Sequence, residues 1–137
     1  MGSEMCIRDS PNIVSVVSIY GESIGEALTT TVGTDIMTVA TDKLVKINSI
    51  IVTNTHATNA VAVTVKILKA GFTSAGIGGS EDNTGTFALA STMNLPADDS
   101  LVLVDKPIYL MEGDVLEGGA SVATADIFIS YEVINDA

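Results

Sequence analysis

Apolar and polar residues alternate most regularly in residues 61–69 (VAVTVKILK). The residues on one side of this run are Val61, Val63, Val65 and Ile67. Because side chains on a strand point alternately to its two faces, the alternation predicts a strand with one face in a core. A second apolar run covers residues 44–53 (LVKINSIIVT), and residues 54–60 between the two runs are rich in turn formers. This order predicts a hairpin in which the two strands pair.

Short β-type runs separated by turn residues continue along most of the chain. They are residues 13–20, 27–32, 35–40, 87–93, 101–104, 107–110, 115–118 and 126–134. Runs at a spacing of about 8–12 residues, with turn signals between them, are typical of β-sandwiches and small barrels. None of the runs has a helical period. We therefore predict an all-β protein, a single antiparallel β-sandwich of jelly-roll-like type with about eight strands.

The same runs suggest how the chain is divided. Residues 27–137 are expected to form the sandwich, and residues 11–26 an N-terminal strand or arm that could serve as an interface. In residues 126–134 (DIFISYEVI) apolar residues again occupy every second position, which predicts a second half-buried strand. One core is expected to contain Ile47, Ile51, Val63, Val65, Ile127 and Ile129.

Residues 1–10 (MGSEMCIRDS) share no pattern with the rest of the chain. They resemble the translation of a transposase-type sequencing adapter read from a GTG start codon, and they lack the apolar stretch and cleavage site of a secretory leader. We interpret them as a non-native scar and exclude them from the fold. Since Cys6 is the single cysteine, the native part has none, which excludes disulfides and thiolate chemistry there.

The charge of the chain limits its partners. Beyond Ser10 there are five lysines, no arginine and fifteen acidic residues. Such an acidic surface repels phosphate backbones and anionic lipid, so we expect neither nucleic acid nor a membrane as a partner. The apolar runs are also much shorter than the roughly 20 residues of a membrane-spanning helix.

Candidate catalytic and metal-binding residues are few. His56 is the single histidine and has no companion that suggests a base or a zinc ligand, so we interpret it as a solvated loop residue. Acidic turns at residues 81–83, 98–99 and 112–114 could present oxygens to Ca²⁺, but none has the register of a known calcium loop. The glycine-rich residues 71–85 lack the lysine and helix of a phosphate-binding loop. We predict no enzyme activity, no catalytic residue, no metal and no cofactor.

Several phrases between residues 35 and 134 occur in an order similar to that of small β-sandwich virion proteins of tailed bacteriophages. They lie in Leu44–Asn54, Leu95–Leu103, Lys106–Ser121 and Ser130–Ile134. The resemblance implies a non-enzymatic component made in the host cytoplasm and placed on the virion exterior, where it decorates the capsid or belongs to the tail. It also implies a homo-oligomer, a trimer or a ring, in contact with major capsid or tail proteins. The long residues 70–86 depart from the pattern and leave the position in the virion open.

Two alternatives stay open beside the virion protein: a carbohydrate-binding or adhesion module, and the C-terminal part of a larger fibre protein. For assembly, the N-terminal strand and the glycine-rich loop are the candidate contact segments, because the strand at 13–20 carries no charge to protect an edge. The candidate interface residues are Ile13, Val14, Val16, Val17, Ile19, Tyr20, Phe72 and Ile77.

Overall fold

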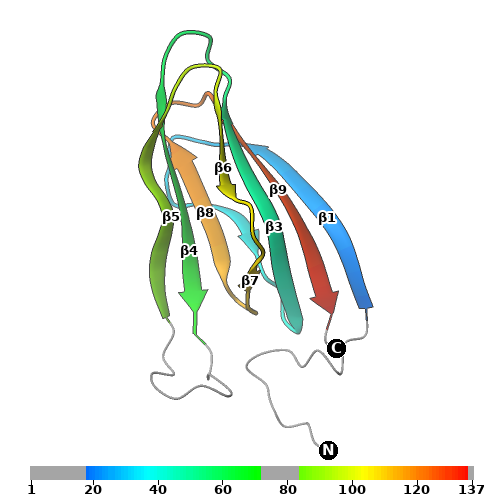
Figure 1. The fold of residues 1–137 in the computed structure, drawn as a ribbon. Coiled ribbons are helices and arrows are strands. Elements are labelled where there is room, and N and C mark those ends of the chain that lie inside the picture. Colours follow the sequence, from blue (N-terminus) through cyan, green and yellow to red (C-terminus); the bar gives the residue numbers. More distant parts are fainter. Residues whose placement is uncertain (1–17, 72–83, 136–137) are drawn as a thin grey trace, which may run out of the picture.

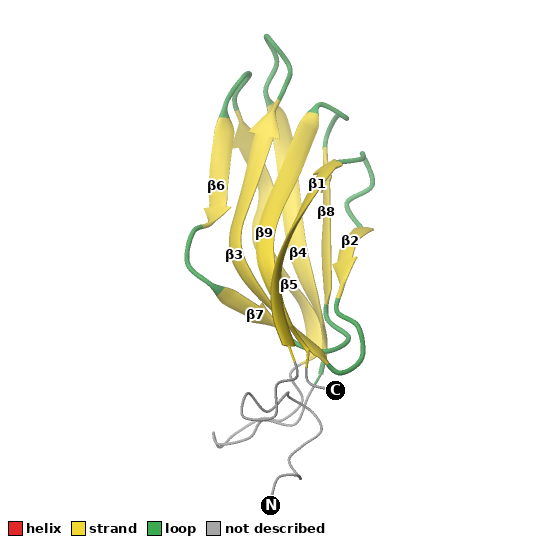
Figure 2. Cartoon of the chain, turned by 90° about the vertical axis from the view of Figure 1, so that its right-hand side faces the viewer, coloured by secondary structure: helices red, strands yellow, loops and turns green. Residues whose placement is uncertain are grey.

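The computed structural model describes residues 18–71 and 84–135. These residues form nine strands in two antiparallel sheets and no helix, which confirms the predicted all-β sandwich (Figures 1 and 2). The strands are β1 Ser18–Ala27, β2 Thr34–Thr38, β3 Lys43–Asn54, β4 Val61–Ala70, β5 Thr84–Leu95, β6 Ser100–Val104, β7 Ile108–Leu110, β8 Val115–Ala120 and β9 Ala125–Asn135. Sheet I has the order β1-β9-β3-β6, with β7 also paired to β3, and sheet II has the order β2-β8-β4-β5.

The predicted hairpin between residues 44–53 and 61–69 is wrong. Both runs form strands, but β3 pairs with β9, β6 and β7 in sheet I, whereas β4 pairs with β5 and β8 in sheet II. The loop at residues 55–60 therefore passes from one sheet to the other. Each strand has one apolar face, and placing the two faces on opposite sides of the core buries both. Alternation shows that a strand has a buried face, but it does not identify the strand's hydrogen-bonded neighbour.

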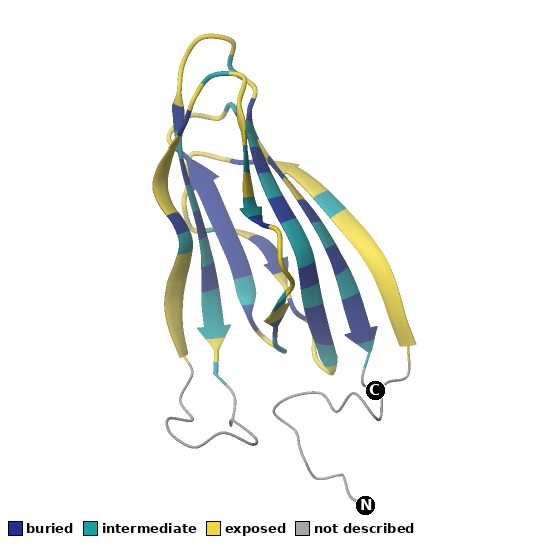
Figure 3. Cartoon of the chain, in the orientation of Figure 1, coloured by how far each residue is buried: buried dark blue, intermediate teal, exposed yellow. Residues whose placement is uncertain are grey.

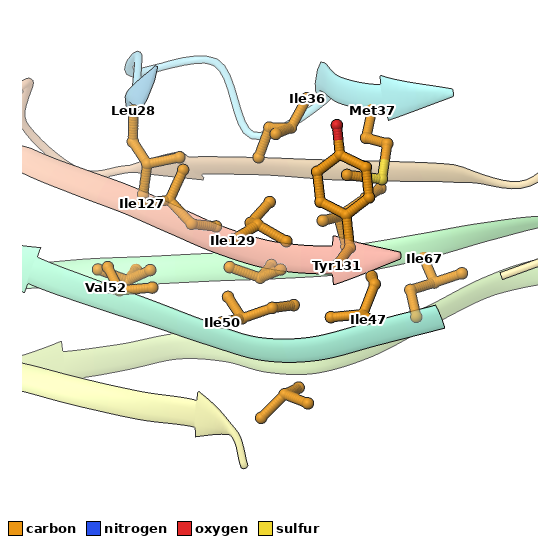
Figure 4. Close-up of a cluster of buried hydrophobic side chains, with 14 of the residues drawn as sticks. Leu28, Ile36, Met37, Ile47, Ile50, Val52, Ile67, Ile127, Ile129 and Tyr131 are labelled. Atoms are coloured by element: carbon orange, nitrogen blue, oxygen red, sulfur yellow. The ribbon is translucent and has the colours of Figure 1, made fainter. Parts of the chain in front are cut away.

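The predicted core is correct except at one position. Ile47, Val63, Val65, Ile127 and Ile129 are all at most 1% exposed. Figure 4 shows isoleucines of β3 and β9 pointing into the same interior as Leu28, Ile36 and Met37 from other segments. Burying so many branched apolar side chains supplies most of the stabilisation of such a domain.

Ile51 is the exception, because it is only partly buried while its neighbours Ile50 and Val52 are fully buried. The pairing of β3 with β9 slips between Ile47 and Ser49. A β-bulge of this kind adds one residue to a strand and reverses which side chains face inward beyond it. Sequence alternation counted from Ile47 consequently assigns Ile51 to the wrong face.

The N-terminal boundaries also differ from those expected. The first strand does not end before Gly21 but continues to Ala27, while residues 13–17 lie outside the described residues. Residues 28–32, expected in a strand, form a loop whose Leu28 is 2% exposed. Leu28 donates its N–H to the Ala125 carbonyl at 2.8 Å, so this loop is fixed at the start of β9 as it leads from sheet I to sheet II.

Candidate assembly surface

Strand β1 forms one edge of sheet I and is exposed along almost its whole length (Figure 3). Of its ten residues only Ile24 is partly buried. Two candidate interface residues lie here: Ile19 is 57% and Tyr20 41% exposed. The strand pairs with β9 on one side, so the backbone groups on its other side offer a template to a further strand. The candidates Ile13, Val14, Val16 and Val17 lie outside the described residues.

The contacts of Tyr131 fix the exposed strand β1 to the sandwich. The Tyr131 hydroxyl donates a hydrogen bond to Glu22 Oε1 at 2.7 Å, and Ile24 packs against the core. Burial, and then the hydrogen bond to Glu22, raise the pKa of Tyr131 to about 12. Beside this contact a groove of about 160 Å³ runs between β1 and the end of β2, with Met37 and Val39 in its lining. The edge strand is thus anchored on the inside and open on the outside.

The second candidate segment joins the same end of the sandwich as the first. Phe72 and Ile77 lie outside the described residues, but the neighbouring ends of β4 and β5 are described. Figure 1 shows these ends at the bottom of the sandwich, where β1 begins and β9 finishes. The described strand ends that border residues 1–17 and 72–83 therefore lie at one end of the sandwich, which we call the lower end.

At the lower end, a buried carboxylate fixes the turn before β8 to the end of β4. Asp114 is 1% exposed, and its Oδ2 lies 2.5 Å from Lys69 Nζ and accepts the Met111 N–H at 2.8 Å. Its Oδ1 accepts the N–H of Ala70 at 3.0 Å. Gly113 has a φ of 86°, and a Cβ there would lie 3.0 Å from the Ala70 Cβ. The aspartate of the Glu-Gly-Asp turn at residues 112–114, a calcium candidate in the sequence, is thus buried and bound to Lys69 and to backbone N–H groups.

At the opposite, upper end a buried amide joins three loops. The Asn54 side chain is fully buried and donates from Nδ2 to the carbonyls of Asn59, Leu95 and Pro96 at 2.8, 3.1 and 3.2 Å. Its Oδ1 accepts the His56 N–H at 3.0 Å and the Thr124 hydroxyl at 3.2 Å. In the sequence Asn54 has only the signature of a turn residue, because its hydrogen-bond partners at Leu95, Pro96 and Thr124 come from distant loops.

His56 and the acidic turn at residues 98–99 also have local structural roles. His56 Nδ1 accepts the N–H groups of Thr58 and Asn59 at 3.1 and 3.0 Å, so the imidazole shapes its own loop and is partly buried rather than fully solvated. Asp99 accepts the Ser100 N–H at 2.8 Å, while residues 81–83 lie outside the described residues. Within residues 18–71 and 84–135 no three His, Cys, Asp or Glu side chains gather as a metal site. The same part of the chain contains no helix long and apolar enough to cross a membrane.

No protein-family model and no curated protein matches the chain. Among solved structures it is similar to the VP2 subviral particle of infectious bursal disease virus, with 17% identity and a TM-score of 0.41 over 87% of this chain and 33% of that chain. It is also similar to a Bacillus endospore appendage protein of disulfide-linked pili, with 14% identity and a TM-score of 0.41 over 99% and 98% of the two chains. A pentameric capsid protein from metagenomic phage sequences has 12% identity and a TM-score of 0.27 over 98% and 70%. This chain spans about a third of the VP2 chain, and these TM-scores are too low to assign a function.

Proposed function

We propose that this chain is a non-enzymatic structural subunit of a tailed-phage virion, which assembles with other copies on the capsid exterior or at the tail. The observation that carries the proposal is the placement of Ile19 and Tyr20 on an exposed edge strand, at the end from which both candidate segments leave. An edge strand without a neighbour on one side is a natural place for another chain to add. Self-assembly would cover the apolar side chains that the single chain exposes.

The strand order supports this proposal. β6 and β7 both pair with β3 and can be counted as two halves of one strand, which leaves four positions in each sheet. The chain then alternates between the sheets from β1 to β4 and again from β5 to β9. This is the connectivity of a jelly roll, an architecture that viral capsid proteins and lectins use. Since one fold serves many functions, the resemblance of the sequence to phage virion proteins supports the virion role among them.

The proposal is tested by comparing the full chain with two N-terminal deletions in sedimentation velocity. Removing residues 1–10 takes away only the adapter-like segment and is the matched control, whereas removing residues 1–17 also takes away Ile13, Val14, Val16 and Val17. The second deletion stops before Ser18, because Ser18 already pairs with Asn135 in the ladder between β1 and β9. We expect the full chain and the shorter deletion to form the same oligomer and the longer deletion to form a smaller one. A full chain that stays monomeric at every concentration would contradict the proposal.

Exterior placement is tested by retention on DNA. Because acidic residues greatly outnumber basic ones, we expect no salt-sensitive binding to duplex or single-stranded DNA. Binding at low salt that weakens as salt rises would contradict a position on the outside of the virion.

A further inference from the structure

An unbroken apolar row crosses the outer face of sheet I. Ile51 lies directly opposite Val102 of β6 on one side and Phe128 of β9 on the other, and Phe128 lies opposite Gly25 of β1. The residues that flank Ile51 and Phe128 along their strands are buried in the core, so these two side chains point outward. Val102 is 56% and Phe128 50% exposed. We call Gly25, Phe128, Ile51 and Val102 the apolar row.

The ring of Phe128 covers the strand next to it. A Cβ added to Gly25 would lie 3.2 Å from Phe128 Cδ1 and 3.6 Å from Cε1, so the ring lies over this glycine. Because Gly25 has no side chain, the Phe128 ring can pack flat against β1. The apolar row therefore projects little from the surface of the sheet. A low apolar strip across four strands is suited to contact with another flat surface.

The corresponding row on the outer face of sheet II is charged. There Glu117 lies directly opposite both Asp35 and Lys66, and the Lys66 ammonium is 4.0 Å from the Glu117 carboxylate. The row on the outer face of sheet I is thus apolar, whereas the row compared with it on the outer face of sheet II is charged. The fold does not require an apolar row at this place in a sheet, and contiguous apolar surface of this kind marks an interaction site.

Charge favours a second copy of the same chain as the occupant of the apolar row. The chain has a formal charge of −11, so two copies repel each other over most of their surfaces. On the outer face of sheet I, Lys46 lies opposite Glu132, with 4.0 Å between the ammonium and the carboxylate, and Asp126 adds one acid two residues from Phe128. A face with both signs and an apolar row can meet the same face of a second copy with little net repulsion.

We propose that the outer face of sheet I binds the same face of a second copy through the apolar row. The inference rests on the proposed function and names one contact surface for the assembly, separate from the N-terminal segment. From strand spacing and rise, four strands of about eight residues cover roughly 500 Å². A stable pair needs about 800 Å² on each partner, so a single contact of this kind is weak and gains strength when it is repeated in an assembly.

The test compares two pairs of matched variants by sedimentation velocity at several concentrations. Val102→Glu places a charge in the apolar row, and Val122→Glu adds the same charge at a valine of similar exposure, 45%, in the turn before β9. Phe128→Ser removes the central ring, and Phe87→Ser removes a ring of equal exposure, 52%, from β5 of sheet II. We expect each row variant to weaken association at least about tenfold and each control to leave it within about twofold. Thermal unfolding shows that every variant is folded before association is compared.

The outcomes separate this inference from the proposed function. If the full chain assembles and the row variants assemble equally well, the face proposal is wrong and the structural role stands. If the Val122→Glu and Phe87→Ser controls weaken association as much as the row variants do, the face proposal is also wrong, because the effect is then one of general charge or hydrophobicity. If removal of residues 1–17 strengthens association through the row, that segment of the same chain covers the face, which overturns a second copy as the natural occupant.

Discussion

The two ends of the sandwich are held by buried polar side chains of opposite character. At the upper end the neutral amide of Asn54 joins three loops through five hydrogen bonds. At the lower end the carboxylate of Asp114 joins one turn to one strand end and is paired with the ammonium of Lys69. An amide can satisfy donors and acceptors at the same time, whereas a carboxylate only accepts and needs a cation or N–H groups around it. At the upper end, Asn54 therefore joins the loops to one another. At the lower end, Asp114 fixes the end of strand β4.

The largest effect is expected from Asn54→Asp. The new carboxylate faces the carbonyls of Asn59, Leu95 and Pro96, to which it cannot donate, and the loops at residues 55–60, 96–99 and 121–124 contain no lysine or arginine to pair with it. A buried charge without a partner costs about 3–5 kcal/mol of the free energy of unfolding. Urea denaturation measures this loss, with Asn94→Asp on the exposed part of β5 as the control. A loss as small as that of the control would show that the amide does not hold the upper end.

Asp114→Asn tests the lower end. We expect it to lower the free energy of unfolding by about 2–4 kcal/mol, somewhat less than Asn54→Asp does. The asparagine keeps one oxygen acceptor but turns an amide group either toward the Ala70 N–H, which Oδ1 accepts, or toward Lys69 and the Met111 N–H, which Oδ2 accepts. The double variant with Lys69→Met removes both charges, and we expect it to recover part of the loss. If the losses of the two single variants simply add in the double variant, the ion pair contributes no coupling to the lower end.

Gly113→Ala examines the turn that carries Asp114. The backbone at residue 113 has a φ of 86°, and the new methyl group would meet the Ala70 side chain at 3.0 Å. We expect a loss of about 1–2 kcal/mol in chemical denaturation. The matched control is Gly33→Ala, where a Cβ has open space and where no positive φ occurs. Equal effects of the two substitutions would contradict the close approach at the lower end.

The smallest effect is expected from Tyr131→Phe, which removes the side-chain hydrogen bond from β9 to Glu22 of β1. The loss is about 1 kcal/mol near neutral pH. The pKa of Tyr131 is raised from 10.0 to about 12 in the folded state, so folding favours the protonated phenol. This contribution is complete below pH 10 and is lost as the pH rises from there through about 12. We expect the variant to lose less stability than the parent over that interval in thermal melts, and parallel pH curves would contradict the assignment.

The lower end also connects stability to assembly. The contacts of Asp114 and Gly113 fix Lys69 and Ala70 at the end of β4, so variants of these residues should loosen that end of the strand before they unfold the sandwich. The apolar row lies on the body of sheet I and shares no residue with these contacts at the lower end. Variants of the lower end and variants of the row therefore address two separable contributions to self-association.

The sequence by itself was sufficient for the class of fold and most of the core. Period-two alternation identified β4 and β9 and placed Val63, Val65, Ile127 and Ile129 inside, because burial of one face leaves its mark on every second residue. The acidic composition also predicts that nucleic acid is not a partner, and retention on DNA tests this prediction. The deletion of residues 1–17 tests whether the N-terminal segment forms contacts between copies, and contacts of the glycine-rich segment stay a prediction.

Only the tertiary structure decided which strands are neighbours and which residues matter for packing at the ends. The partner of β3 is β9, more than seventy residues away, and a local hairpin signal carries no information about such a pairing. The bulge between Ile47 and Ser49 depends on that pairing, and it moved Ile51 from the expected core to the outer face, where it joins Phe128 and Val102. The importance of Asn54 and Asp114 has the same origin. Their hydrogen-bond partners are assembled from distant segments, and alternation along one strand records burial but not the identity of what covers it.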